Sequence, residues 1–369
     1  MTSDARIAVV GSGLAGFTAY QTLRRGGFEP GEITVFGTEA DPAAGWRRRA
    51  AAIRQREMRS ESDGHCLPTS FPGLAIRSAA RRRSAAPLLA SAFDRYHPTV
   101  DEFLGHVEAL RERSGWDKSL DDRRIERVRA VDGGFELDGC GVFAHVLVAP
   151  GHPGLNIPTE LRDDPRAVHS YEPHEYASTV TVIGAGIAAA TEWLNALAAG
   201  SEVVSIRRRE PLRRPLNVPR EYFSRRGLAA YHRLGLEERV ARLRALLAPS
   251  YPLGSTWDKP LARAAAEDRF RVEPSLNGSA QVICATGFVR GFEKDALLAR
   301  LVGDHGLETA GGWIVLAPDG SVPSLTDDTR TLALAGAPAP MAFPAADTLA
   351  GARYVAHGFL RRIASCRTR

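Results

Sequence analysis

Short apolar runs rich in β-branched residues recur along the chain, and two of them lead into a glycine turn and a helical pattern. The first run, Arg6–Val10, is followed by Gly11-Ser12-Gly13-Leu14-Ala15-Gly16 and a periodic stretch that ends at Gly26-Gly27. The second, Val180–Ile183, is followed by Gly184-Ala185-Gly186-Ile187-Ala188-Ala189 and a stretch that ends at Gly200. Because glycine commonly ends a helix, both stretches predict a strand, a tight turn and a helix.

The remaining pattern predicts an α/β chain. We expect strands near 32–36, 125–137, 142–148, 202–206, 281–284 and 331–335, a helix starting near Pro98 or Thr99, and a last helix over about 347–363. An amphipathic stretch at about 219–248 either packs on the sheet or caps a substrate pocket. Segment 57–76 fits neither period and is interpreted as a cofactor-lining loop, with a solvated loop as the alternative. The triplets Arg47–Arg49 and Arg81–Arg83 are interpreted as solvated surface.

The glycine turns carry the chemistry. In G-x-G-x-x-G/A after a strand, the first glycine permits the turn, the second lets a pyrophosphate approach, and the third brings the helix close to the strand. The helix N-terminus then offers free N–H groups and a positive dipole end. A plain tight turn is the alternative. We predict cofactor contacts at Gly11, Gly13, Leu14, Ala15 and Gly16, and at Gly184, Gly186, Ile187, Ala188 and Ala189.

The residues after the second strand of each unit distinguish the two nucleotides. An acid that holds ribose hydroxyls is expected after 32–36; Gly37 stands there, and Glu39 is the predicted substitute. After 202–206 the chain reads Arg207-Arg208-Arg209. Guanidinium groups bind a 2′-phosphate, which an acid would repel. Arg207 and Arg208 therefore favour NADPH over NADH.

Composition excludes several classes of protein. The 369 residues carry a net charge of +5, and nearly all the positive charge is arginine dispersed along the chain, so we expect no nucleic-acid partner. No apolar run is long enough to span a bilayer, and we expect a soluble cytoplasmic protein. The four cysteines form no C-x-x-C pair, so neither a metal site nor a redox disulfide is expected from neighbours.

The chain contains two units of strand, glycine turn and helix, and strands from its C-terminal part complete the first unit. This arrangement resembles the flavoproteins with two dinucleotide-binding domains. Ala149-Pro150-Gly151 and Ala285-Thr286-Gly287-Phe288 stand where that superfamily has its A-T-G crossings. The missing C-x-x-C pair excludes the disulfide-reductase branch. The turn Gly45-Trp46-Arg47, the segments 70–74 and 98–104, and His169-Ser170 with Pro173 are instead similar to motifs of the class B flavin monooxygenases.

The resemblance implies two Rossmann-like dinucleotide-binding domains, with the NADPH domain (173–278, helical insertion about 219–248) inserted into the FAD domain (1–172 and 279–369). It implies reduction of FAD by NADPH, reaction with O₂ to a flavin C4a-(hydro)peroxide, and oxygenation of a small organic substrate. Further cofactor contacts are then expected at Gly45, Trp46, Val128, Pro150, Gly151, Thr286, Gly287 and Gly336. The catalytic candidates are Arg59, His65 and Asn156.

Several readings stay open at this point. N-, S- and Baeyer–Villiger oxygenation are equally compatible with the residues, and specialised-metabolite tailoring is a hypothesis from composition alone. A homodimer is one arrangement that we keep open. The first alternative function is an NADPH-dependent flavoprotein reductase or oxidase without oxygen insertion. The second is a flavin-binding partner protein with no turnover.

Overall fold

The computed structural model describes residues 7–58, 73–93, 96–208, 210, 212–213, 218–251, 255–276, 278 and 280–367. Two of the three catalytic candidates, Arg59 and His65, lie outside these residues, as does most of the predicted loop at 57–76. No helix in the described ranges combines the length and apolarity that crossing a membrane requires.

The first domain is built on five parallel strands in the order β17-β7-β1-β2-β3. Their bounds are β1 Ile7–Val10, β2 Ile33–Phe36, β3 Leu120–Asp121, β7 His145–Val148 and β17 Thr331–Leu334. Every residue of β1, β7 and β17 is buried. Helices therefore cover both faces of the sheet, which explains why these strands are continuous apolar runs.

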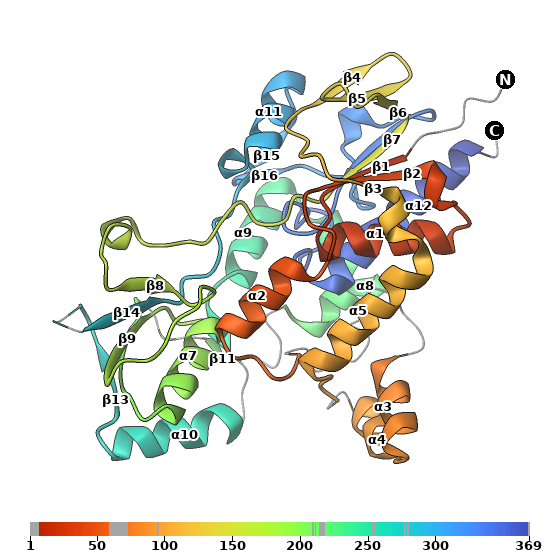
Figure 1. The fold of residues 1–369 in the computed structure, drawn as a ribbon. Coiled ribbons are helices and arrows are strands. Elements are labelled where there is room, and N and C mark those ends of the chain that lie inside the picture. Colours follow the sequence, from red (N-terminus) through yellow and green to blue (C-terminus); the bar gives the residue numbers. More distant parts are fainter. Residues whose placement is uncertain are drawn as a thin grey trace.

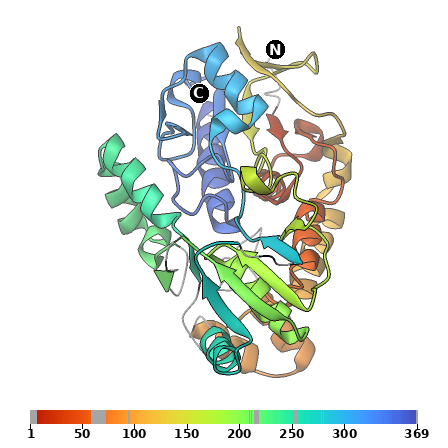
Figure 2. The ribbon, with the colours of Figure 1, turned by 90° about the vertical axis from the view of Figure 1, so that its left-hand side faces the viewer.

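A second parallel sheet has the order β13-β10-β9-β14-β8. Its strands are β8 Ala167–His169, β9 Thr179–Ile183, β10 Glu202–Ile206, β13 Phe270–Glu273 and β14 Gln281–Cys284. All of them lie between β7 and β17 in the sequence, and the two sheets form separate bodies (Figures 1 and 2). The predicted fold class, one Rossmann-like domain inserted into another, is confirmed; the exact boundaries stay predictions.

Helices and small sheets complete the two bodies. In the first are α1 Leu14–Arg25, α2 Ala44–Ala52, α3 Leu74–Arg82, α4 Ala86–Ala92, α5 Val100–Ser114, α6 Trp116–Ser119, α11 Ala296–His305 and α12 Leu349–Arg367. The second contains α7 Ile187–Ala198 and α10 Ser255–Ala266. Short strands are β4 Val128–Val131, β5 Gly134–Leu137, β6 Val142–Phe143, β11 Leu212–Arg213, β12 Ser250–Tyr251, β15 Thr309–Ala310 and β16 Trp313–Ile314. The 3₁₀ turns are η1 Pro30–Glu32, η3 Thr159–Leu161, η4 Arg220–Phe223, η5 Phe292–Lys294 and η6 Pro323–Leu325.

Local sequence signals account for several of these bounds. Thr99 caps α5 in a capping box: its Oγ1 accepts from the Glu102 N–H at 3.1 Å, and the Glu102 carboxylate accepts from the Thr99 N–H at 3.1 Å. This confirms the predicted helix start. The region 125–137 folds as the β4–β5 hairpin, because Gly133 turns the chain with a φ of +80°.

The helical insertion packs on the first domain and not on the sheet of its own domain. It consists of α8 Arg225–Arg233 and α9 Leu236–Leu246. The Tyr231 hydroxyl donates to the Pro340 carbonyl at 3.1 Å, and His232 Nε2 donates to the Ala342 carbonyl at 2.7 Å. Phe223, just before α8, makes an edge contact with Phe343. The insertion therefore covers the loop that follows β17.

The helix α2 joins the two bodies. Ile53, which caps its C-terminus, accepts a hydrogen bond through its carbonyl from Asn195 on α7, at 2.8 Å. Arg54, at a φ of +50°, pairs with Glu175 at 2.8 Å and lies over the Tyr176 ring at 4.6 Å. Figure 1 shows α2 between the two bodies, beside α7. Side-chain contacts from one domain thus fix the orientation of the other.

A buried polar cluster lies beneath this contact. The Glu192 carboxylate is fully buried and accepts from the Tyr176 hydroxyl at 2.7 Å and from His174 Nε2 at 3.2 Å. Burial by itself lowers the pKa of His174, but the hydrogen bonds to Glu192 and to the Glu172 carbonyl, with the Glu192 charge, raise that pKa above the ordinary value. The charged imidazolium is therefore favoured in the folded state.

A pH-dependent stability follows, and His174→Gln tests it. A raised folded-state pKa gives stability that is fully present below the unfolded pKa and is lost as pH rises through the folded value. The loss of unfolding free energy on substitution should therefore be larger at about pH 6 than at about pH 9 in urea titrations.

His232→Gln is the matched control of opposite sign. Burial lowers the pKa of His232, so its neutral form is favoured and its contribution is lost as pH falls. The cost of that substitution should be greater at about pH 8 than at about pH 5.5. Equal costs of His174→Gln at both pH values would contradict the account of the buried cluster.

Candidate functional site

The first glycine turn is closed by backbone on three sides. Gly11 has a φ of +116°, and a Cβ there would lie 2.1 Å from the Ala149 carbonyl oxygen. Its N–H donates to the Phe36 carbonyl at 2.8 Å, at the end of β2. A Cβ on Gly16 would lie 1.8 Å from the Gly11 oxygen. No other residue fits either position, so β1, β2, β7 and α1 meet at one point.

The ligand side of this turn is open. Gly13 is the exposed N-cap of α1, and a Cβ there would meet nothing within 4 Å. The first turn of α1 contains no acidic residue, so its N–H groups and positive dipole end are free for an anion. Gly336, at a φ of +74°, lies against Ala15 from the loop after β17. These features fit a dinucleotide pyrophosphate.

The second turn repeats this geometry. Gly184 has a φ of +137°, a Cβ there would lie 2.4 Å from the Ala285 oxygen, and its N–H donates to the Ile206 carbonyl at 3.0 Å. Gly186 is the N-cap of α7 with open space beside it, and the first turn of α7 again holds no acid. Ala189 stands in place of the third glycine, and even a Cβ added at Gly184 would lie 3.5 Å from the Ala189 methyl group, an ordinary contact distance. The same cradle for an anion thus occurs twice.

The two crossings between domains are also equivalent. The Ala149 N–H donates to the Val10 carbonyl at 2.7 Å, and the Ala285 N–H donates to the Ile183 carbonyl at 2.8 Å. Gly151 and Gly287 follow at φ values of +83° and +75°. Pro150 therefore occupies the place of Thr286 without changing the turn. The crossings then run antiparallel, through a bridge between Leu155 and Phe288.

His169 holds the second crossing in place. Its Nδ1 accepts from the Tyr171 N–H at 3.1 Å, so Nε2 carries the proton and donates to the Gly287 carbonyl at 2.9 Å. The side chain is fully buried, and burial lowers its pKa. The histidine thus stays neutral and acts as a structural tie between β8 and the crossing.

Asn156, a predicted catalytic residue, lies on the same crossing. Its N–H donates to the Gly287 carbonyl at 2.9 Å, and its side-chain amide donates to the Thr286 carbonyl at 3.3 Å. The Thr286 hydroxyl donates to the Asn156 carbonyl. The side chain is exposed at the seam between the domains, where catalysis stays a prediction for it.

Gly37 occupies the place expected for the ribose-binding acid for a steric reason. A Cβ at Gly37 would lie 2.4 Å from Ser12 Oγ, so the serine inside the first turn excludes a side chain there. Ser12 Oγ accepts instead from the Glu39 N–H at 3.3 Å. The Glu39 carboxylate is paired with Arg48 at 2.7 Å, and a ribose contact from it stays a prediction.

The remaining predicted contacts occupy different settings. Arg207 is mostly buried, pairs with Glu210 at 2.9 Å and lies over the Trp193 ring, whereas Arg208 is exposed after β10. Gly45 and Trp46 start α2, and Trp46 packs edge-on against Phe103. Val128 is buried at the start of β4, and its carbonyl accepts from His305. In the ranges described above, no cluster of side chains with metal-ligand character occurs.

Arg49 corrects one expectation from the sequence. The side chains of Arg47 and Arg48 are 48% and 66% exposed, as solvated surface should be, but Arg49 is half-buried with its guanidinium 5.1 Å from the Phe288 ring centre. Helical periodicity explains the difference. Arg49 follows Trp46 by three residues and precedes Ile53 by four, and so shares their packed face.

Aromatic rings at the crossing were also missed. The Phe288 ring stacks on His152 at 4.3 Å and on Tyr171 at 5.1 Å, with interplanar angles of 6° and 12°. Burial lowers the pKa of His152 to about 4 despite the nearby Asp347, so this ring is neutral. The sequence placed Phe288 in the second crossing, but its two stacking partners are far from it in the chain, so only the fold could bring the three rings together.

Known proteins match this chain in structure only. No protein-family model matches, and no curated protein matches in sequence. Among solved structures, the ornithine N-hydroxylase KtzI from Kutzneria sp. 744, in complex with reduced FAD, NADP⁺ and L-ornithine, superposes with a TM-score of 0.73 at 13% identity over 99% of both chains. The ornithine hydroxylase PvdA from Pseudomonas aeruginosa gives 0.70 at 15% identity, covering 97% of this chain and 99% of that one.

These matches decide the fold. The chain has the fold of the class B flavin monooxygenases. The bacillithiol disulfide reductase Bdr from Bacillus cereus also matches, with a TM-score of 0.61 at 12% identity over 99% of both chains. The monooxygenase-like fold is therefore shared with a reductase, and the choice between oxygenation and simple reduction depends on the residues of this chain.

Two glycine substitutions separate folding from nucleotide binding in the first turn. Gly16→Ala introduces a backbone clash and should lower the free energy of unfolding by about 2 kcal/mol or more. Gly13→Ala meets open space and should change it by no more than about 1 kcal/mol, yet its methyl group should prevent FAD binding. Urea unfolding and the flavin content of the purified protein measure the two effects. A Gly13→Ala protein as rich in FAD as the wild type would contradict the assignment.

Proposed function

We propose that this chain is an FAD- and NADPH-dependent monooxygenase that oxygenates a small organic substrate. The observation that carries the proposal is that the glycine turn occurs twice. The two turns are equivalent, each packs against a carbonyl of a crossing between the domains, and they lie at the carboxyl edges of the two sheets, where the domains meet. A protein that binds a single dinucleotide needs only one such turn. The fold shared with KtzI, a hydroxylase whose structure contains reduced FAD and NADP⁺, supports it.

The first domain (1–172 and 279–369) is proposed to hold FAD. The α1 N-terminus, with Gly13, Leu14 and Ala15, would bind the pyrophosphate, and Gly336 permits the close approach of the loop after β17. The bound flavin would accept a hydride and activate O₂ for transfer to the substrate. The protein itself supplies position and shields the seam from water.

The second domain (173–278) is proposed to hold NADPH. The α7 N-terminus would bind the pyrophosphate through the backbone at Gly186 and Ile187. Arg208 is exposed beyond β10, where a 2′-phosphate is expected, whereas Arg207 is engaged by Glu210 and Trp193. Arg208 is therefore the residue proposed to distinguish NADPH from NADH.

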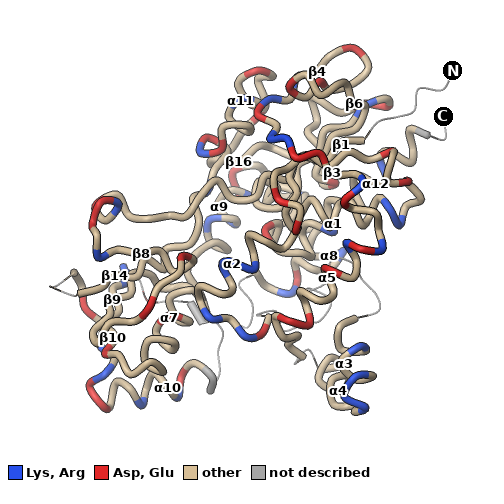
Figure 3. The backbone as a smooth tube through the Cα atoms, in the orientation of Figure 1, with Lys and Arg blue, Asp and Glu red and all other residues tan. Residues whose placement is uncertain are grey.

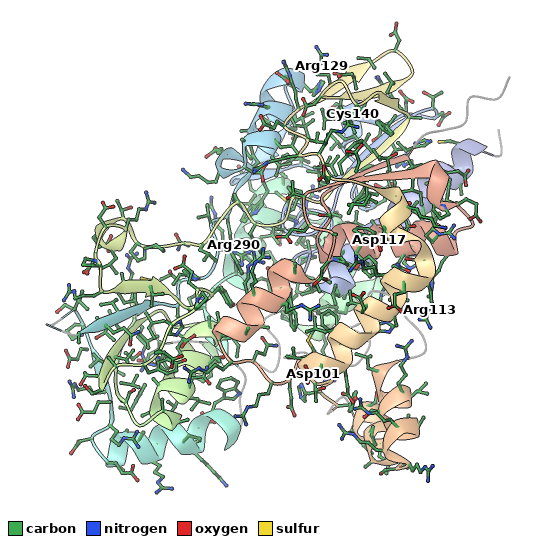
Figure 4. All side chains as sticks on the ribbon, in the orientation of Figure 1. Asp101, Arg113, Asp117, Arg129, Cys140 and Arg290 are labelled. Carbon is green, nitrogen blue, oxygen red and sulfur yellow. The ribbon has the colours of Figure 1, made fainter. Side chains whose placement is uncertain are left out.

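A pocket beside the crossings is the proposed entry for the substrate. Its lining includes Gly151 of the first crossing, Val289 just after the second, and the rings of His152, Phe292 and Trp313, with Arg290 and Asp295 as its charged residues. Arg290 lies at the seam between the two domains (Figure 4), 3.6 Å from Asp347. An aromatic pocket with few polar groups suits a small organic molecule. Tailoring of a specialised metabolite is the proposed context.

The fold shared with a disulfide reductase favours one second candidate, an NADPH-dependent flavoprotein reductase or oxidase without oxygen insertion. Of the three cysteines within the described residues, Cys366 lies near the C-terminal end of α12, and the other two are unsuited to disulfide chemistry at the seam. Cys284 is fully buried, and burial raises the pKa of its thiol to about 11; Cys140 lies on the β4–β6 meander, away from the seam (Figure 4). A reductase of this kind would need another electron acceptor.

Isotopically labelled O₂ distinguishes the two functions. The FAD-loaded protein is given NADPH, labelled O₂ and a panel of amines, thioethers and ketones, and the products are analysed by mass spectrometry. The proposal predicts a product with one labelled oxygen atom and less than stoichiometric hydrogen peroxide. Peroxide equal to the NADPH consumed, with every substrate class, would favour the reductase or oxidase.

Arg208→Gln tests the choice of reductant. Loss of a guanidinium–phosphate contact costs about 1.5–3 kcal/mol, so the KM for NADPH should rise by about 10-fold or more. The KM for NADH, which lacks the 2′-phosphate, should stay unchanged. Steady-state kinetics with both reductants measure the ratio. An equal rise for both would place the 2′-phosphate site elsewhere.

A further inference from the structure

Arg49 on α2 lies where the first domain faces the second crossing. Its guanidinium carbon is 5.1 Å from the centre of the Phe288 ring, which is itself stacked between His152 and Tyr171. The side chain is half-buried, and burial lowers the pKa of the guanidinium. A cation from the FAD domain is therefore presented to the edge of the other domain.

Arg49 differs from its neighbours in having no acidic partner. Arg47 pairs with Asp41 at 2.9 Å, Arg48 with Glu39 at 2.7 Å, and Arg54 with Glu175 at 2.8 Å. Within the part of the chain that the structure describes, the Arg49 side chain has no ion pair or hydrogen bond; its contact is the face of the Phe288 ring.

The groups around Arg49 supply no negative charge. They are the Phe288 ring, the Tyr171 phenol, the histidines 152 and 169, which burial keeps neutral, and the cation of Arg48. The nearest carboxylates act on the two histidines and have other partners: Asp347 pairs with Arg290 at 3.6 Å, and Glu172 accepts from the His169 N–H at 3.0 Å. A partly desolvated cation without an anion is costly, because a cation–π contact recovers only part of the lost hydration. This arrangement is expected where a bound ligand brings the anion.

The position of Arg49 identifies the ligand. Tyr171 follows the end of β8, and Phe288 follows the crossing after β14, so Arg49 lies at the carboxyl edge of the second sheet. Just after α2, the Ile53 carbonyl accepts from Asn195 on α7, and Arg54 lies over the ring of Tyr176, which is hydrogen-bonded to Glu192. Arg49 stands one helical turn before this contact with α7, at the carboxyl edge of the sheet, which is also the edge where α7 begins after β9.

A dinucleotide at this edge passes from β10 over the α7 N-terminus toward β14 and β8, with its pyrophosphate in the middle. We infer that Arg49 binds the pyrophosphate of the dinucleotide in the second domain, and does so from the first domain. The inference rests on the proposed function only in taking that dinucleotide to be NADP(H). Since the cation belongs to one domain and the glycine turn to the other, nucleotide binding holds the two domains together.

The test is equilibrium binding, which requires no turnover. FAD-loaded wild type, Arg49→Gln and Arg49→Lys are titrated with NADP⁺ and, separately, with NAD⁺ by calorimetry. Arg263→Gln is the matched control, because Arg263 is an exposed arginine on α10 that pairs only with Glu267 four residues away. Arg208→Gln serves as the comparison for a 2′-phosphate contact.

The expected result is a loss of about 10- to 100-fold in the affinity of Arg49→Gln for both nucleotides, by the same factor. Arg49→Lys should recover part of it, and FAD content should be unchanged. Arg208→Gln should weaken NADP⁺ binding and leave NAD⁺ binding unaltered, and Arg263→Gln should match the wild type. An equal loss of affinity for NADP⁺ and NAD⁺ identifies the pyrophosphate as the group that Arg49 binds, because the pyrophosphate is the anion that both nucleotides share.

Three results would overturn the inference. They are unchanged binding of both nucleotides by Arg49→Gln, a loss confined to NADP⁺, or unchanged nucleotide binding with a raised KM for an acidic substrate. Failure of the proposed function looks different. A wild type that binds NADP⁺ and transfers its electrons but forms only peroxide would remove oxygenation and leave the Arg49 contact intact.

Discussion

A backbone carbonyl packed against a glycine Cα is the contact on which the rest of this structure depends. It occurs twice, between Ala149 and Gly11 and between Ala285 and Gly184, at distances where no side chain could stand. Each contact fixes the crossing strand to the nucleotide turn, so the loop that leaves one domain begins at the edge where that domain binds its ligand. The position of the seam between the domains follows from these two contacts.

The crossings are held by polar and aromatic contacts of different origin. His169 anchors the Gly287 carbonyl from β8, while Phe288 is stacked between His152 and Tyr171. Both histidines are neutral because they are buried. The stacked rings at the seam are therefore uncharged, and the charged groups around them include Arg49 and the pairs Arg290–Asp347 and Arg54–Glu175. Charges of both signs are spread over the rest of the chain (Figure 3). Uncharged aromatic rings beside the site suit redox chemistry that water would disrupt.

The parts of the fold that could be predicted from the sequence are those fixed by local constraints. Glycines at positive φ, a strand before them and a helix after them are all contiguous, so both cradles and the inserted topology were predicted correctly. The capping box of Thr99 and Glu102 is local in the same sense. Equivalence of the two crossings was harder to predict because of Pro150, yet the backbone geometry is the same.

The parts that could not be predicted depend on contacts between distant segments. Arg49 was grouped with two solvated arginines, although its helical face turns it toward Phe288, which is remote in the sequence. The sequence showed that Gly37 stands where a ribose-binding acid is expected. The reason, that the Ser12 side chain leaves no room for a side chain at this position, is visible only in three dimensions. For the insertion at 219–248, packing on the sheet of its own domain was wrong, because Tyr231 and His232 contact the loop after β17. The alternative, a cap over a substrate pocket, stays a prediction.

The central claim is that one chain binds two dinucleotides at these equivalent turns and passes electrons between them. In its most direct test, the flavin bound to the purified protein is first identified and quantified. The protein is then titrated anaerobically with NADPH while the flavin absorbance is recorded. The account predicts one FAD for each chain and complete bleaching by an equimolar amount of NADPH. A protein that is colourless and cannot be reconstituted with FAD, or whose bound flavin NADPH does not reduce, would contradict it.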